Sequence, residues 1–481
     1  MRWKSIAHVI GIVLGVMILF MSLCFVVAVI DREPASVLRA WWITLVMTML
    51  AALGLSLFNR GPIQVSHRES LLIVVVGWTA SSFFGSLPFY LSGAIPSEIN
   101  ALFETISGLT TTGASILPDP GTLPRSLLLW RSTTHFLGGL GIIVFCIAIL
   151  PMLGTGGMQL FRAETSAAMG DRLAPRIAKT AKITWMIYCA LTLILIGLLK
   201  LGGMNWFESV NHAFACISTG GFSTRGGSIS EFHSHYIELV LILFMLIGAI
   251  NFNTHYLILH RSYRALLQDN QIRFFLGTWL TLSLFAALSI WGTTYATLGE
   301  SLRHATFSVT SMITTTGFCT EDFDHWTPFA KLTLFLCMLM GGCAGSTSGG
   351  IKQIRVMVVL KKVLRTLRLF MYPRAVVPVK VGRVPVEPGV TSAMTGFVLL
   401  YLLALLAGTA LMTLVVDGET AVSTVAATLG GVGPGFGLAG ASESYALMPS
   451  AGKVILMVMM LLGRLEIYAF IALFTPDFWR R

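Results

Sequence analysis

Long hydrophobic stretches alternate with short polar segments along the whole chain. Each stretch is about 20 residues or longer, the length at which an α-helix crosses ~30 Å of hydrocarbon. The polar segments leave no room for a sizeable soluble domain. The pattern predicts an all-α integral membrane protein with ten crossings, at Ile6–Ile30, Ala40–Phe58, Leu71–Leu91, Leu127–Leu150, Thr184–Leu201, Ile237–Leu259, Phe274–Leu298, Pro328–Leu369, Ala393–Val415 and Ala451–Phe474.

Four shorter amphipathic stretches lie between pairs of these spans. A helix of about ten residues is only about 15 Å long, so it reaches halfway across the membrane. Each stretch must therefore enter and leave on the same side, as a re-entrant half-helix. The half-helices are expected at Glu98–Leu109, Phe207–Ile217, Ser301–Ile313 and Ala421–Leu429.

A short phrase rich in glycine and hydroxyl residues follows every half-helix. The phrase glycines Gly113, Gly221, Gly317 and Gly433 are 108, 96 and 116 residues apart. The same order of span, half-helix, phrase and span surrounds each of them, which is the signature of an internal repeat. The phrase residues are Thr110, Thr111, Thr112 and Gly113; Ser218, Thr219, Gly220 and Gly221; Thr314, Thr315, Thr316 and Gly317; and Gly431, Val432, Gly433, Pro434 and Gly435.

The four phrases have the chemistry of a site for a bare cation. Extended backbone at mid-membrane depth is tolerated only inside protein or against a water-filled cavity. Glycine lets consecutive carbonyls point the same way, and four such segments form rings of oxygens that replace a hydration shell. Small-residue clusters also serve as helix-packing surfaces, the better interpretation of a single copy. Four copies at matched positions favour the cation site.

The repeats define the expected architecture. Residues 1–66 form two extra transmembrane helices. Four repeats of a first transmembrane helix (M1), a pore helix and a second transmembrane helix (M2) then surround a central pore. The repeats are expected at residues 67–153, 154–259, 260–383 and 384–481.

A glycine-rich segment at residues 341–350 interrupts the last span of the third repeat. Its five glycines disfavour a helix, because each costs up to about 1 kcal/mol relative to alanine. A loop at this depth is expected to lie just inside the phrases, where it can obstruct the pore; a flexible hinge is the alternative. The candidate gate residues are Gly345, Ser346, Thr347, Ser348, Gly349 and Gly350.

Arg464 lies in the last hydrophobic span, where an ionisable residue costs at least ~2.5 kcal/mol at the bilayer centre. It stands two positions before Glu466, so the two side chains point in different directions on a helix. We expect Arg464 to face the pore and to hold the glycine-rich loop in the closed state. Snorkelling to the interface is the alternative for Arg464 and the better interpretation for Arg131 and Lys331.

The distribution of charge sets the orientation. The chain has a formal charge of +11, and 23 of its 33 Lys and Arg lie at the termini and in four alternate short loops. Basic loops stay in the cytoplasm, so both termini are expected there. The 352–383 loop is the most basic; anionic lipid or a partner protein would satisfy it. Basic loops between membrane spans do not indicate nucleic-acid binding.

Motifs for catalysis or resident cofactors do not occur in the sequence. The ten histidines are scattered, no H-E-x-x-H or G-x-S-x-G lies in a span, and the seven cysteines lack metal-ligand spacing. No G-x-x-x-x-G-K-[ST] phosphate loop is present. The sequence therefore predicts neither an enzyme nor a bound organic cofactor.

The TTTGAS, STGGFST, TTTGF and GVGPGFG phrases, together with the two extra helices, resemble the Trk/Ktr/HKT superfamily of cation transporters, in particular its bacterial TrkH/TrkG type. The resemblance implies a potassium and rubidium uptake pore in a bacterial inner membrane, with a simplified potassium-channel filter. Glycine at Gly113, Gly221, Gly317 and Gly433 accompanies potassium preference in that superfamily. The register of the second phrase stays open between Gly220 and Gly221.

The resemblance also implies partners. It predicts an intramembrane gating loop, a homodimer in the membrane, and a cytosolic ring of TrkA-like nucleotide-binding subunits. Passive flux and proton- or sodium-coupled symport remain alternatives at this point. Broken helices suit a coupled transporter, whereas fourfold symmetry with every half-helix entering from outside favours a channel-like pore.

Overall fold

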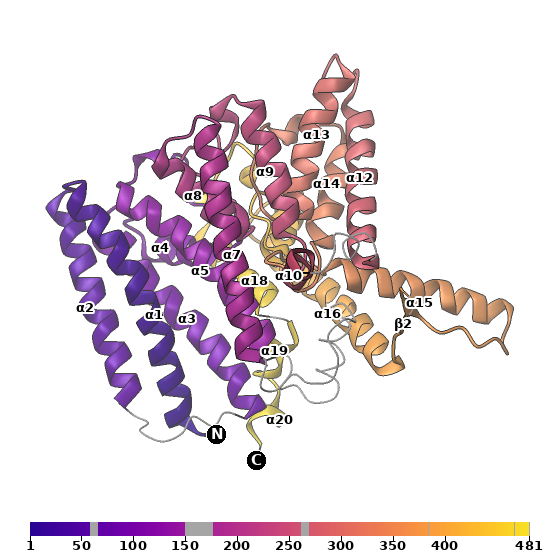
Figure 1. The fold of residues 1–481 in the computed structure, drawn as a ribbon, viewed down its shortest axis with the longest axis horizontal. Helices are drawn as coiled ribbons and strands as arrows, with labels where there is room; N and C mark the ends of the chain where they lie inside the picture. Colours follow the sequence, from indigo (N-terminus) through magenta and orange to yellow (C-terminus); the bar gives the residue numbers. More distant parts are fainter. Residues whose placement is uncertain (58–65, 150–176, 261–268, 383, 466, 481) are drawn as a thin grey trace.

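The computed structural model describes residues 1–57, 66–149, 177–260, 269–382, 384–465 and 467–480. These residues form a predominantly helical protein. Six of its helices are long and apolar enough to cross a membrane, and a seventh span is added if one sharply bent helix pair is taken together. The two termini lie at the same end of the molecule (Figure 1). The all-α membrane architecture expected from hydropathy is confirmed.

Two helices, α1 (Trp3–Ile30) and α2 (Ala35–Leu57), pack against each other at one side of the molecule (Figure 1). The next helices are α3 (His67–Leu91), α4 (Glu98–Leu109) and α5 (Arg125–Ile149), then α7 (Ile177–Leu201), α8 (Trp206–Ile217), α9 (His235–Gly248) and α10 (Phe252–His260). They are followed by α12 (Asn270–Ile290), α13 (Leu298–Ile313), α14 (Pro328–Met340) and α15 (Gln353–Met371), and by α16 (Pro388–Met412), α17 (Gly418–Gly430), α18 (Ser450–Arg464), α19 (Ile467–Ala472) and α20 (Pro476–Trp479).

Short elements occupy the connections. One antiparallel hairpin pairs β1 (Lys380–Val381) with β2 (Val384–Pro385). Single 3-10 turns are η1 (Pro120–Thr122), η4 (Ser230–Phe232), η5 (Phe323–His325), η6 (Gly437–Ala439) and η7 (Tyr445–Leu447). Helix α15 projects away from the helix bundle on the side opposite α1 and α2 (Figure 1).

The four short helices α4, α8, α13 and α17 begin in the same way. In each, the side chain of the preceding residue accepts a hydrogen bond from the backbone N–H three positions later, which satisfies one of the free donors of the first turn. The backbone N–H of Thr420 thereby holds the pKa of Asp417 below its usual value. Beyond the first turn these helices are largely buried, as a half-helix inside a membrane protein must be. The four capping residues are Ser97, Asn205, Thr297 and Asp417.

One expected span is not a single helix, and another is wrong in its bounds. The segment Ile237–Leu259 is two helices, α9 and α10, at 101° to each other. The break is stable because the Cys343 backbone N–H donates to the carbonyl of Ala249 over 2.8 Å and the Thr347 hydroxyl donates to that of Gly248 over 3.1 Å. The span expected at Phe274–Leu298 ends at Ile290, eight residues before α13 begins.

Helices α17 and α18 approach closely at Gly463. A methyl group there would overlap the backbone carbonyl of Leu429. We therefore expect Gly463→Ala to lower the melting temperature of the detergent-purified protein by several degrees, because overpacking costs about 1–3 kcal/mol. Thermal unfolding followed by tryptophan fluorescence measures the effect.

The matched control for this substitution is Gly277→Ala on α12, where an added methyl group meets nothing within 4 Å. It should leave the melting temperature unchanged or raise it slightly, since alanine favours the helix. Equal melting temperatures for the two variants would show that the α17–α18 approach has room to relax.

Candidate functional site

The four glycine phrases meet at one place in the structure. A methyl group added to the glycine of any phrase would overlap a backbone carbonyl of the next phrase in chain order, and the fourth phrase returns to the first. The contacts join Gly113 to Gly220, Gly221 to Thr316, Gly317 to Val432, and Gly433 to Thr112. The phrases, separated by about a hundred residues in the chain, therefore form a closed ring.

All four phrases have the same unusual backbone conformation. Positions are counted here so that Gly113, Gly221, Gly317 and Gly433 are each the fourth, which places Gly430 at the first position of the fourth phrase. The residue at the second position has a positive φ of 51° at Thr111, 55° at Thr219, 57° at Thr315 and 69° at Gly431. Left-handed backbone costs a threonine roughly 1–3 kcal/mol, so the surrounding structure must fix it. Two positions later φ is again positive, between 80° and 101°, at Gly113, Gly221, Gly317 and Gly433. The angles align Gly221, rather than Gly220, with Gly113.

Hydrogen bonds tie each phrase back to its own half-helix. The backbone N–H of the third residue donates to a carbonyl near the helix end over 2.8–2.9 Å. Within the described part of the chain, no hydrogen bond ends on the carbonyl oxygens of these same third residues, Thr112, Gly220, Thr316 and Val432. The hydroxyls of Thr110 and Thr112 bond each other at 2.8 Å, as do those of Thr314 and Thr316.

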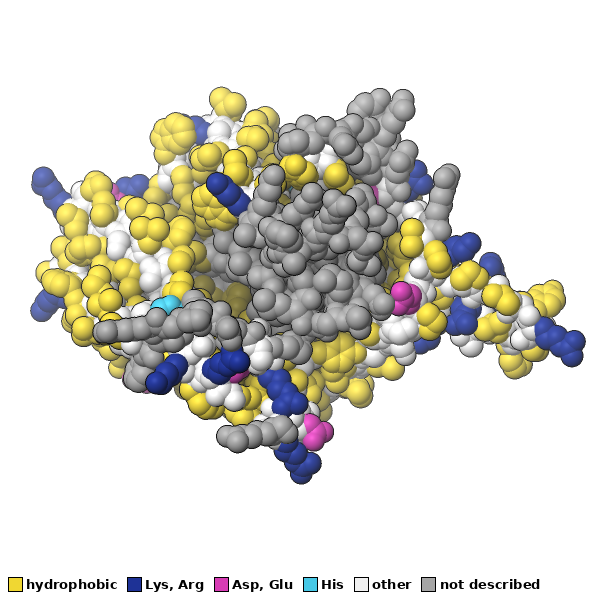
Figure 2. Space-filling model, turned by 60° about the horizontal axis from the view of Figure 1, so that its bottom comes forward, with side chains coloured by type: hydrophobic (Ala, Val, Ile, Leu, Met, Phe, Trp, Pro, Cys, Tyr) yellow, Lys and Arg dark blue, Asp and Glu magenta, His cyan; other side chains and the backbone are white. Residues whose placement is uncertain are grey.

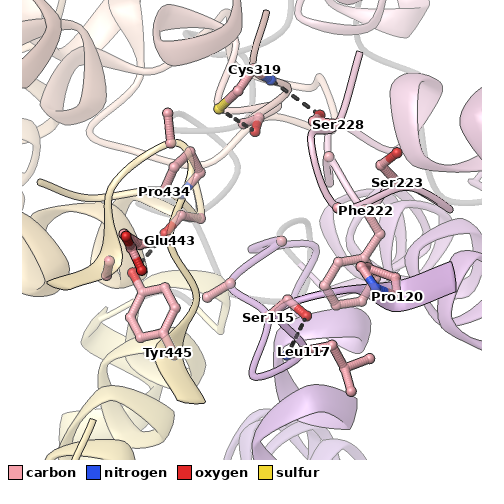
Figure 3. Close-up of a pocket in the computed structure, with 18 of the residues that line it drawn as sticks. Ser115, Leu117, Pro120, Phe222, Ser223, Ser228, Cys319, Pro434, Glu443 and Tyr445 are labelled. Atoms are coloured by element: carbon pink, nitrogen blue, oxygen red, sulfur yellow. Dashed lines mark hydrogen bonds between the residues drawn. The ribbon is translucent and has the colours of Figure 1, made fainter. Parts of the chain in front are cut away.

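A cavity of about 90 Å³ opens where the chain leaves the four phrases. Figure 3 shows side chains from all four units around it. The Tyr445 hydroxyl donates to the carbonyl of Gly433 over 2.7 Å, and its backbone N–H donates to the carbonyl of Ser115. The cavity has Ser115, Phe222, Ser228, Cys319, Pro434 and Glu443 among its lining residues.

The glycine-rich segment 341–350 lies against the half-helix ends and the phrases. The Gly349 backbone N–H donates to the Thr315 hydroxyl over 2.7 Å, and a methyl group on Gly349 would overlap the carbonyl of Gly430. The Thr347 hydroxyl donates to the carbonyl of Ile217 over 3.0 Å. The segment thus contacts units two, three and four at the ends of their half-helices.

Arg464 is buried beside this segment. Its Nη1 donates to the carbonyl of Thr347 over 2.8 Å, and its Nη2 donates to the carbonyl of Gly138 on α5 over 3.1 Å. One guanidinium therefore joins the glycine-rich segment to a helix of the first unit. Among the proposed gate residues Gly345, Ser346, Thr347, Ser348, Gly349 and Gly350, Thr347 is the one whose hydrogen bond to Arg464 the described residues show.

The interpretation of Arg131 as an interfacial arginine is wrong. Its side chain is 2% exposed and forms a 2.7 Å ion pair with Glu104 on α4. A carboxylate in the middle of a half-helix is a signal for such a partner, because a buried charge is stable only when paired. The side chain of Lys331 is partly exposed, as an interfacial lysine would be, and it also forms an ion pair with Glu419 at 2.7 Å.

The basic 352–383 segment divides into a buried and an exposed part. Arg355 is buried and its guanidinium lies 3.8 Å from the ring centroid of Phe397, so it is not available to a partner. Figure 2 shows Lys and Arg side chains interspersed with hydrophobic ones along the projecting arm. The exposed basic residues of α15 are Arg365 and Arg368, whereas Lys361 and Lys362 are half-buried.

Comparisons with known proteins converge on one family. The family model described as "TrkH: Cation transport protein" matches residues 35–481. The chain is 42% identical over 426 residues to a Trk system potassium uptake protein TrkH of Halomonas elongata, with 87% of each covered, and 37% identical to that of Escherichia coli K12, with both covered fully. It superposes on the crystal structure of the potassium transporter TrkH from Vibrio parahaemolyticus with a TM-score of 0.91, at 34% identity over the full length of both chains.

The Thr347 hydroxyl generates a prediction about the glycine-rich segment. Thr347→Val keeps the shape of the side chain but removes the donor to Ile217 and Gly248, and with it about 1–3 kcal/mol. Hydrogen–deuterium exchange of peptides covering 341–352 should accelerate. Thr413→Val, at an exposed hydroxyl on the end of α16, is the control and should exchange as wild type does. Unchanged exchange in Thr347→Val would show that the segment is held by other contacts.

Proposed function

The chain belongs to the TrkH family of cation transport proteins, and we propose that it is the pore-forming membrane subunit of a potassium uptake system. It is a multi-pass membrane protein and a transporter, not an enzyme. The relatives that it matches over their full length are potassium uptake proteins, which supports potassium, with rubidium as its close substitute, as the transported ion.

The ring of four phrases is the observation that carries the proposal. Its third residues present four carbonyl oxygens that no described hydrogen bond occupies. Carbonyl rings of this kind replace the hydration shell of a potassium ion as it passes. The half-helices end at the same ring, so the partial negative charge of each C-terminal end adds to the attraction for a cation. We assign the filter to residues 110–113, 218–221, 314–317 and 431–435.

The glycine-rich segment and Arg464 form the proposed gate. The segment lies against the half-helix ends, on the path that an ion leaving the ring must follow. Arg464 holds it through the carbonyl of Thr347, and its positive charge opposes a cation. At ~4 Å and an effective dielectric near 20, two like unit charges repel by about 4 kcal/mol. Both effects favour a closed resting state.

Membership of this family also supports a proposal for the architecture and the partners. We propose two N-terminal helices in residues 1–66 and four pore repeats at 67–153, 154–259, 260–383 and 384–481, with both termini in the cytoplasm of a bacterial inner membrane. A TrkA-like nucleotide-binding ring would control opening, and the protein would form a homodimer. The exposed basic residues of α15 would contact anionic lipid or the TrkA-like nucleotide-binding subunits. Termini at one end of the molecule support an even number of crossings (Figure 1).

Coupled symport with protons or sodium is the second candidate. The 101° break between α9 and α10 favours it, because broken helices form the ion sites of many secondary transporters. Reversal potentials in bilayers distinguish the two. A shift with an imposed pH gradient alone indicates proton coupling, a shift with a sodium gradient alone indicates sodium coupling, and a potential set only by potassium indicates a passive pore.

The first prediction of the proposal is that the purified chain, reconstituted alone, takes rubidium and potassium into liposomes. All the oxygens of the ring come from this one chain. Uptake of radioactive rubidium against a potassium-loaded interior measures the flux, with protein-free liposomes as the control. Flux that requires a second membrane protein would refute a pore formed by this subunit.

The second prediction is that Arg464→Ala raises basal flux without changing the preference between potassium and sodium. The substitution removes both the donor to Thr347 and the positive charge, and it leaves the ring intact. The rubidium assay gives the flux and competition by sodium gives the preference. Arg39→Ala, at an exposed arginine on α2, is the matched control and should behave as wild type. Low flux from well-folded Arg464→Ala would mean that the arginine supports conduction.

A further inference from the structure

A buried ion pair lies beside the ring, between the first and second units. Glu104 is on α4 and Arg131 is on α5, and their side chains are 0% and 2% exposed. The Arg131 Nε donates to the Glu104 Oε1 over 2.7 Å. A pair this deeply buried adds little to stability by itself, because the desolvation of both charges offsets their attraction. Its contacts indicate a different role.

Glu104 fixes the chain that leaves the first phrase. Its Oε2 accepts the backbone N–H of Ile116 and its Oε1 accepts the hydroxyl of Ser115, each over 2.9 Å. These two residues stand two and three positions after Gly113. One carboxylate therefore sets where the first phrase ends.

Arg131 fixes the chain that leaves the second phrase. Its Nη1 donates to the carbonyl of Ser223 over 3.0 Å, and its guanidinium lies 3.9 Å from the ring centroid of Phe222. Phe222 follows Gly221 directly and also stacks on His135 at 4.0 Å between ring centroids. The His135 ring in turn lies so close to Gly220 that a methyl group there would overlap it.

The arrangement is particular to the first two units. Nine positions before the phrase glycine, the first unit has Glu104, whereas the other three have uncharged or weakly basic residues. His212 in the second unit bonds the Ser223 hydroxyl at 3.0 Å. The third and fourth units have Ser308 and Thr424 there. A carboxylate with an arginine partner thus holds one seam of the ring.

We propose that the Glu104–Arg131 pair positions the first and second phrases relative to each other and thereby sets the preference of the ring for potassium over sodium. The inference rests on the proposed function of the ring as a filter. The guanidinium uses three nitrogens toward Glu104, Ser223 and Ser115, so both exit strands move if the fork is lost. Neither side chain touches the ion; both are positioning residues.

Arg131→Lys tests the fork separately from the charge. Lysine keeps the positive charge opposite Glu104 but cannot reproduce the planar, multidentate contacts. We expect the sodium-to-potassium permeability ratio, from reversal potentials in bilayers, to rise about tenfold, or about 1.4 kcal/mol. The double variant Glu104→Gln/Arg131→Met removes both charges without leaving one buried alone and should show the same rise. Melting temperatures in detergent report folding.

Arg125→Lys is the matched control, because Arg125 lies on the same helix, is 55% exposed and pairs with Asp31. It should keep the wild-type ratio. A wild-type ratio in both test variants would overturn the inference, as would failure of both to fold, which would make the pair structural only. If one variant alone folds, its ratio decides. Wild-type protein without potassium permeability would refute the filter itself, a separate outcome.

Discussion

A backbone carbonyl without a hydrogen-bond donor is energetically costly inside a membrane, and this constraint determines the contacts at the centre of the protein. The chain leaves helical geometry at four phrases, at the break after α9 and along the glycine-rich segment. Several of the freed carbonyls accept hydrogen bonds from neighbouring segments. The Thr347 hydroxyl donates to carbonyls at the ends of α8 and α9, and the Cys343 backbone N–H donates to the carbonyl of Ala249. The Arg464 guanidinium donates to the carbonyl of Thr347. The carbonyls at the third position of each phrase receive no donor among the described residues, and under the proposed function a cation would bind them.

The four units reach the same backbone geometry with different side chains. Threonine occupies the strained second position in three phrases and glycine in the fourth. Serine, asparagine, threonine and aspartate cap the four half-helices with one hydrogen-bond pattern. The geometry is therefore the shared requirement, and the sequence of each unit is one of several ways to meet it. The buried Glu104–Arg131 pair departs from this equivalence, because the other three units have no carboxylate at the position of Glu104.

Local signals in the sequence predicted the local structure well. The bounds of α4 match the expected Glu98–Leu109, since a capping serine precedes it and the phrase ends it. Hydropathy did not predict the break in Ile237–Leu259, because the donors that permit it come from residues about a hundred positions away. Arg131 was misplaced for the same reason. Its partner lies 27 positions earlier, in a half-helix whose contact with α5 only the fold establishes. The filter and gate roles themselves remain predictions.

Having all four phrases on one polypeptide changes what a single mutation does. In a ring of four identical subunits, one codon change alters four symmetry-related positions together. Here the same change alters one quarter of the ring, so its energetic effect is correspondingly smaller. Under the proposed filter function, ion preference would then change in small increments over evolutionary time, and each quarter could diverge while the other three kept the pathway working.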